Sequence, residues 1–272
     1  MIDAPAAGSI AEAVDLARYP LHAPGSSKAQ ALIAECRRQL AERGCCLLPG
    51  FLTETALGTM AREAVALAPL AHRTPGSRGT AYLDAPDESF PEDHPRRRLQ
   101  PTSVGAVAYD LIPRNSLVRR LYEWDGLLEF LAAALGKDRL FRYADPLGAL
   151  NIAAMHAGEA LLWHFDQTDF VVSLLLQKCR AGGVFEYVPN IRSAETPHYG
   201  RVQALLDGSR EGVIEVDMAP GTLALFEGRN SIHRVSPIAG DRERLIALLG
   251  YDTKPGTMSS DRLKQRRYGR IA

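Results

Sequence analysis

The fold is decided by residues 149–177, which read ALNIAAMHAGEALLWHFDQTDFVVSLLLQ. Short apolar runs alternate in this stretch with turn-forming residues such as Gly158 and Asp169. Similar runs recur further along the chain, among them GVFEYVP, GTLALFEG and RLIALLGYD, and each is bounded by Gly, Pro or Asp. Many short strands at this spacing are typical of an antiparallel sandwich or barrel. We therefore expect a β core over about residues 138–256.

The part before this core, about residues 1–137, is expected to be mainly helical. Apolar residues recur at helical spacing in SSKAQALIAECRRQLAERG, where Ser27 and Gln30 fit a capping box and Gly44 fits a stop signal. CCLLPGFL is expected to form a short buried strand, followed by a second helix from about Thr53.

Three further segments complete the expected organisation. Residues 115–136 predict one long helix or two short ones. Residues 70–105, with many prolines and the charged run PEDHPRRRLQP, predict long loops. Residues 257–272 are expected to form a C-terminal tail. The chain shows no internal repeat or low-complexity linker, so we expect one α+β domain over residues 1–272, with the helices packed on the β core.

Composition excludes several classes of protein. With 46% hydrophobic and 24% charged residues and a formal net charge of zero, the chain is not expected to bind nucleic acid. No apolar run is long enough to span a bilayer, and the N-terminal sequence has no basic region followed by an apolar core. The four cysteines lack the spacing of a zinc site or of a disulfide framework, so we expect reduced thiols in a cytoplasmic protein.

His164 and Asp166 form an HxD triplet between aromatic residues. Such a triplet alone fits either a metal site or a hydrogen-bonded pair in a surface turn. His233 lies in a later expected strand, 233 − 164 = 69 residues further on, and strands that distant in sequence can be neighbours in a sandwich. Two histidines and one carboxylate make up the facial triad of iron(II) oxygenases, and the absence of cysteine ligands argues against structural zinc.

Arg242 and Arg244 are expected on one face of a strand that continues with Ile246 and Leu248. An arginine on an inward face is costly unless it is paired, and the remote carboxylate of 2-oxoglutarate would be such a partner. The alternative is a pairing with surface acids at the strand entrance, which we expect for one of the two arginines. Asn151, on the strand before the HxD triplet, is a further candidate for contact with the keto acid or the substrate.

The HxD triplet, the distal His233 and an arginine nine or eleven residues later resemble the iron(II)/2-oxoglutarate-dependent dioxygenases. Over about residues 140–256 the sequence is similar to a bacterial branch that contains hydroxylases and radical halogenases acting on free amino acids. The resemblance implies a double-stranded β-helix (jelly roll). It also implies that iron(II), 2-oxoglutarate and O2 are used to break an unactivated C–H bond, with succinate and CO2 as coproducts.

The expected function is hydroxylation of a small molecule, an amino acid or a derivative of one. Radical halogenases of this branch have Gly or Ala where this chain has Asp166, so the resemblance implies hydroxylation rather than halogenation. Two alternatives stay open: a desaturase or cyclase acting on a natural-product or carrier-bound substrate, and a cupin-like metal-binding protein without oxygenase chemistry. The arginines in residues 96–98 either clamp a substrate carboxylate or form a solvated charge run, and the oligomeric state is left open.

Overall fold

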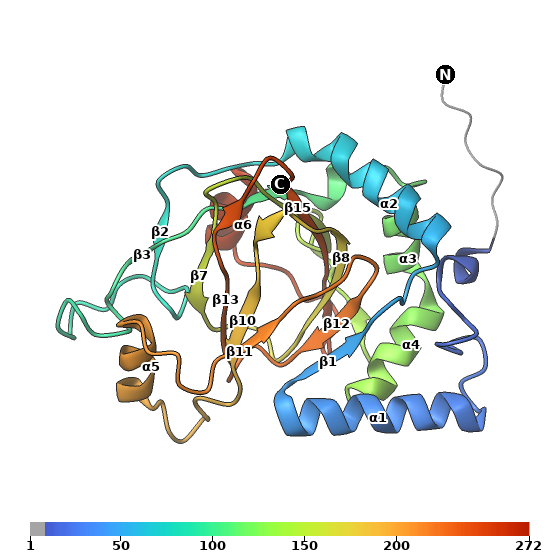
Figure 1. Ribbon diagram of the computed structural model, residues 1–272, viewed down its shortest axis with the longest axis horizontal. Helices are drawn as coiled ribbons and strands as arrows, with labels where there is room; N and C mark the ends of the chain where they lie inside the picture. Colours follow the sequence, from blue (N-terminus) through green and yellow to red (C-terminus); the bar gives the residue numbers. More distant parts are fainter. Residues whose placement is uncertain (1–8, 272) are drawn as a thin grey trace.

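Two antiparallel sheets face each other in the computed structural model, which describes residues 9–271. The larger sheet has the strand order β1-β12-β8-β15-β6-β4 and the smaller one β11-β10-β13-β7 (Figure 1). The six strands of the larger sheet are β1 (Cys45–Leu48), β4 (Gly105–Val107), β6 (Leu150–Met155), β8 (Val171–Gln177), β12 (Leu223–Phe226) and β15 (Arg244–Leu249). The four strands of the smaller sheet are β7 (Leu161–His164), β10 (Phe185–Val188), β11 (Ile214–Val216) and β13 (Ile232–Val235).

Six very short strands pair in twos beside these sheets. They are β2 (Arg78–Gly79) with β3 (Gln100–Pro101), β5 (Phe141–Arg142) with β16 (Tyr251–Asp252), and β9 (Ala181–Gly182) with β14 (Ile238–Ala239). The arrangement is a jelly roll with helices packed on it, so the predicted α+β class with a mainly β core is confirmed.

The central strands of the larger sheet are buried on both faces: one face packs against the helices, and the other faces the space between the two sheets. Successive side chains of a strand point to opposite faces. In β6, Leu150 and Ile152 belong to the core beneath the helices, whereas Asn151 and Met155 face the space between the two sheets. β15 follows the same rule, with Leu245 and its alternate residues in the core and Arg244, Ile246 and Leu248 on the inner side. The inner face of this sheet is therefore one wall of a cavity.

Four helices cover the outer face of the larger sheet (Figure 1). They are α1 (Ser27–Arg43), α2 (Glu54–Leu67), α3 (Leu117–Glu123) and α4 (Asp125–Ala134). The predicted helix ends are close. α1 ends at Gly44, whose φ of 64° suits glycine, and α2 is capped by Thr53. The capping box at Ser27 is wrong, because the N-cap is Ser26, whose Oγ accepts a hydrogen bond from the Ala29 amide.

Several elements were not expected from the sequence. β1 is the short strand that was expected over CCLLPGFL, whereas β4 was not expected. Both are edge strands of the larger sheet and come from before residue 138, so the β core draws on both parts of the chain. Residues 70–105 are mainly loop, as predicted, apart from the short strands β2 and β3 and the start of β4. Two further helices are α5 (Tyr199–Leu206) and α6 (Asp261–Tyr268). The chain also forms three 3-10 turns, η1 (Ile10–Ala13), η2 (Ala68–Leu70) and η3 (Tyr109–Leu111).

The expected C-terminal tail thus contains α6, which is docked by buried contacts. The Nζ of Lys264 lies 4.0 Å from the Oδ1 of Asp145, and both side chains are almost fully buried. Tyr268 packs into a small apolar cluster with Ala106 and Leu147. These contacts fix α6 beside β4, next to the cavity.

The helices and the cysteines were also compared with the expectations from the sequence. Within residues 9–271, no helix combines the length and the apolar character needed to cross a bilayer. All four cysteines are free and buried. Residues 1–8, on which part of the expectation about the N-terminal sequence rests, lie outside the described residues.

Candidate functional site

A cavity of about 470 Å³ lies between the inner faces of the two sheets. The larger sheet contributes side chains from β1, β6, β8, β12 and β15, and the smaller sheet contributes side chains from β7, β10 and β13. Further parts of the wall come from α6, from the loop between residues 74 and 84, and from the segment between β7 and β8 that contains Asp166. A concave site of this size that is lined by apolar side chains with a few polar groups is the usual form of a small-molecule site.

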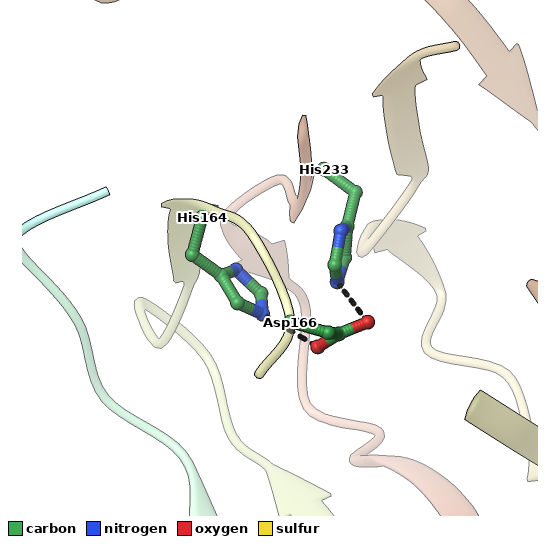
Figure 2. A group of neighbouring side chains, drawn as sticks. All are labelled: His164, Asp166 and His233. Carbon is green, nitrogen blue, oxygen red and sulfur yellow. Dashed lines mark ion pairs between the residues drawn. The ribbon is translucent and has the colours of Figure 1, made fainter. Parts of the chain in front are cut away.

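The two predicted histidines meet in this cavity across neighbouring strands. His164 ends β7, His233 lies in β13, and the two are register partners in the smaller sheet. The chain turns after His164 and brings Asp166 between the two rings (Figure 2). The Nε2 of His164 lies 3.7 Å from one carboxylate oxygen of Asp166, and the Nε2 of His233 lies 3.6 Å from the other. The three ligand atoms lie within 4.8 Å of one another.

The protonation of both histidines suits metal binding. Burial lowers the pKa of His164 to about 4, with a further contribution from His233, and burial lowers the pKa of His233 to about 4 as well. Both imidazoles are therefore neutral at neutral pH. Their Nδ1 atoms lie 2.8 Å from the Leu162 carbonyl oxygen and 3.1 Å from the Ser231 carbonyl oxygen. A carbonyl can only accept, so each Nδ1 carries the proton and each Nε2 keeps its lone pair toward Asp166.

Asp166 is the least satisfied member of the group. Burial raises its pKa, while His164 and Arg267 oppose this shift. Its Oδ2 is buried and has no hydrogen-bond partner among residues 9–271. A buried carboxylate between two neutral imidazoles is costly unless a cation is present. Two imidazole nitrogens and one carboxylate oxygen therefore fit a divalent first-row metal ion with open coordination positions.

The two candidate arginines, Arg242 and Arg244, lie in different environments. Arg244 is the first residue of β15, is only 4% exposed and lines the cavity. Within the described residues, its guanidinium forms no ion pair within 4.0 Å, and burial lowers its pKa to about 10. Arg242 is exposed on the turn before β15 and is not part of the cavity wall. Asn151 is buried in the wall, where its Oδ1 accepts a hydrogen bond of 3.0 Å from Arg267.

A family model described as halogenase D matches residues 28–264 of the sequence. The chain belongs to the halogenase D family. This confirms the resemblance to the oxygenase branch that contains halogenases. No curated protein matches the chain at a significant level.

Solved structures share the fold of this halogenase D family member at low sequence identity. One is an oxidoreductase of the 2OG-Fe(II) oxygenase family from Burkholderia pseudomallei, with a TM-score of 0.53, 17% identity, and coverage of 86% of this chain and 94% of that one. Another is the α-ketoglutarate-dependent epimerase SnoN from nogalamycin biosynthesis, with a TM-score of 0.55, 15% identity, and coverage of 82% of this chain and 83% of that one. A third is HygX from Streptomyces hygroscopicus with nickel, 2-oxoglutarate and hygromycin B bound. Its TM-score is 0.51 and its identity 14%, and the match covers 80% of this chain and 86% of that one.

A glycine holds Asp166 in place in this halogenase D family member. Gly228 precedes β13, and its carbonyl oxygen accepts a hydrogen bond of 3.0 Å from the Asp166 amide. A Cβ atom at position 228 would lie 1.7 Å from the Oδ2 of Asp166. The carboxylate therefore fits between the two imidazoles only because residue 228 has no side chain. The sequence motif gave no sign of this requirement, since Gly228 lies 62 residues after Asp166 (228 − 166).

We expect Gly228→Ala to displace the carboxylate and to weaken divalent metal binding about 10- to 100-fold, the usual cost of disturbing a group that orients a ligand. Metal titration of the purified variant measures this. Gly200→Ala is the matched control, because no atom lies within 4 Å of the added methyl group in α5. Unchanged affinity in Gly228→Ala would contradict the positioning role.

The cavity also includes residues that the sequence analysis did not single out. Phe185 and Phe226 surround the ring of His233, with centroid distances of 5.7 Å and 4.7 Å. Three arginines of α6 line the outer wall. By contrast, the charge run at residues 96–98 pairs with acids: Arg96 with Asp84 and Asp87, Arg97 with Glu92, and Arg98 with Asp207. These three arginines lie outside the cavity wall.

Proposed function

We propose that this protein is an iron(II)/2-oxoglutarate-dependent oxygenase that hydroxylates an unactivated C–H bond of a small molecule, an amino acid or a derivative of one. One observation carries the proposal: the same cavity holds the His164–Asp166–His233 group and a buried arginine, Arg244, for which residues 9–271 provide no acidic partner within 4.0 Å. The family match and the shared fold support the same class. The absence of a membrane-spanning helix among the described residues fits the further proposal of a cytoplasmic location.

Each part of the cavity has a role in this chemistry. His164, Asp166 and His233 would hold iron(II) on one face and leave the other positions to ligands. Arg244 would hold the remote carboxylate of 2-oxoglutarate by a charge-assisted pair. Iron with the keto acid and O2 supplies the oxidant that breaks the C–H bond. Apolar side chains such as Phe185 and Phe226 exclude water, and the shape of the cavity positions the substrate bond.

The burial of Arg244 supports an oxygenase over the cupin-like alternative. A metal-binding protein without keto-acid chemistry would have no use for a buried arginine that lacks a partner, and burial of an unpaired charge is costly. Desaturation and ring formation need the same residues as hydroxylation, and relatives of this fold include the epimerase SnoN. A mass-spectrometric substrate screen separates these reactions, because hydroxylation adds one oxygen atom and desaturation removes two hydrogen atoms. We expect the oxygenated product.

We also expect the product to contain oxygen rather than halogen, even though the family is named after a halogenase. Asp166 supplies a carboxylate ligand at the position that would have to be vacated for chloride. A tethered ligand competes at a high effective concentration, so free chloride is disfavoured. Turnover in excess chloride or bromide, followed by analysis of the product's isotope pattern, tests this. A halogenated major product from the unmutated protein would overturn the role given to Asp166.

A further inference from the structure

We infer that the substrate carries a net negative charge and that Arg266 and Arg267 of α6 bind its anionic group. This inference rests on the proposed function, because it takes the cavity between the sheets to be the substrate site. It narrows the substrate class to small molecules with a carboxylate or phosphate group that no ammonium group of the same molecule balances.

Three arginines of α6 form part of the cavity wall: Arg262, Arg266 and Arg267. Residues 262 and 266 are one helical turn apart, so these side chains share one side of the helix. No carboxylate oxygen of the described residues lies within 4.0 Å of any of the three guanidinium groups. Arg234, in β13, is by contrast paired with Glu186 at 2.7 Å.

Two of these arginines are held in place by the protein. A Cβ atom at Gly79 would lie 2.8 Å from the Nη2 of Arg266, so β2 leaves just enough room for this guanidinium. Arg267 donates from Nη2 to the Oδ1 of Asn151 at 3.0 Å, while its Nε is buried without a hydrogen-bond partner in residues 9–271. A buried donor without an acceptor costs about 1–3 kcal/mol. The bidentate fork of an arginine is suited to a carboxylate or a phosphate.

The charge of the cavity leads to the same conclusion. Its wall contains four arginines, the three of α6 and Arg244, and two aspartates, Asp84 and Asp166. The formal charge of these side chains is therefore 4 − 2 = +2. Iron(II) and the dianion of 2-oxoglutarate carry opposite charges of equal size, so binding both leaves this charge unchanged. Burial lowers the pKa of Arg266, and repulsion from Arg262 and Arg267 adds to the shift. Without a ligand the like charges of Arg262, Arg266 and Arg267 repel one another, and a bound anion would reduce this repulsion.

A zwitterionic amino acid would leave this excess charge in place. Its ammonium group would also need an acid. Among the described residues the wall contains one aspartate besides Asp166, namely Asp84, which is 57% exposed and lies 3.9 Å from Arg96. The excess positive charge of the cavity is better balanced by molecules with a net negative charge. These include acidic amino acids, N-acylated amino acids, other organic acids and phosphate monoesters. Within the proposed hydroxylase activity, these are the substrates that we expect.

Thermal unfolding of the iron(II)-loaded protein, kept free of O2 and at constant ionic strength, tests the inference in two steps. Saturating 2-oxoglutarate first fills the Arg244 site, and its stabilising effect, lost in Arg244→Ala, tests the proposed function separately. Inorganic phosphate or acetate is then added, with chloride as the ionic-strength control. Ligand binding stabilises by mass action, so we expect phosphate, acetate or both to raise the melting temperature by about 2–6 °C at roughly 20 times the dissociation constant. The larger of the two shifts identifies the preferred anion.

The variants Arg266→Gln and Arg267→Gln should lose this second shift, whereas Arg201→Gln on exposed α5 should keep it. Without ligand, Arg266→Gln should melt at the same temperature as the unmutated protein or higher, because it removes repulsion between like charges. A shift no larger than that in chloride would overturn the inference, as would an unchanged shift in the Arg266→Gln/Arg267→Gln double variant. Neither result would affect the 2-oxoglutarate step, so the two proposals fail independently.

Discussion

His164→Ala and His233→Ala should each reduce iron(II) binding from one ion per chain to a small fraction of that value. Each change removes one of three protein ligands and leaves Asp166 buried beside a single imidazole. Loss of a group that merely orients a ligand typically costs 10- to 100-fold in metal affinity, so loss of a ligand itself should cost more than about 100-fold. Metal analysis after gel filtration, with iron(II) supplied anaerobically, measures the stoichiometry.

His22→Ala is the matched control for these variants, because His22 is exposed and far from the HxD triplet in sequence. It should retain the full iron content. Circular dichroism establishes that each variant is folded, since both histidines lie in the smaller sheet. Stoichiometric iron in a folded His164→Ala/His233→Ala double variant would show that the metal is bound elsewhere.

Arg244→Ala should raise the dissociation constant of 2-oxoglutarate at least 30-fold in the iron-loaded protein. Truncating one partner of a buried charge pair costs about 2–5 kcal/mol, and each 1.4 kcal/mol is a factor of ten. The pair is buried here, because Arg244 is only 4% exposed. Anaerobic calorimetric titration with 2-oxoglutarate measures the change.

Arg242→Ala is the internal control for this prediction. Arg242 is two residues away in sequence, carries the same charge and is exposed outside the cavity wall. Its removal should change the dissociation constant less than about 3-fold, since exposed charges contribute little. If Arg242→Ala weakens binding and Arg244→Ala does not, the keto acid occupies a different position from the one proposed.

The main features of the site could be predicted from local sequence pattern. The HxD triplet and the distal His233 required only that two strands become neighbours, which the jelly roll brings about through the β7–β13 pairing. Period-two alternation placed Arg244 on the inner face with Ile246, and the structure buries both. Alternation could not decide between Arg242 and Arg244, because the strand begins at Arg244 and the residues before it are in a turn.

The unpredicted features depend on contacts between distant residues. α6 has the sequence DRLKQRRY, without an apolar period, and it is held by the buried contacts of Lys264 and Tyr268 with other parts of the chain. β4 has only three residues and becomes a strand by pairing with β6. The need for glycine at position 228 follows from the position of the Asp166 carboxylate and is not visible in the local sequence.

Anaerobic visible spectroscopy tests whether one cavity binds iron(II) and 2-oxoglutarate together, and it needs no knowledge of the substrate. A keto acid that chelates iron(II) gives a charge-transfer absorption in the visible range. We expect this absorption to grow as 2-oxoglutarate is added to the iron-loaded protein and to saturate at one equivalent per chain. It should be absent in His233→Ala and should require much more 2-oxoglutarate in Arg244→Ala. An iron-loaded protein that develops no such absorption and binds no 2-oxoglutarate would contradict the assignment of this cavity as an oxygenase site.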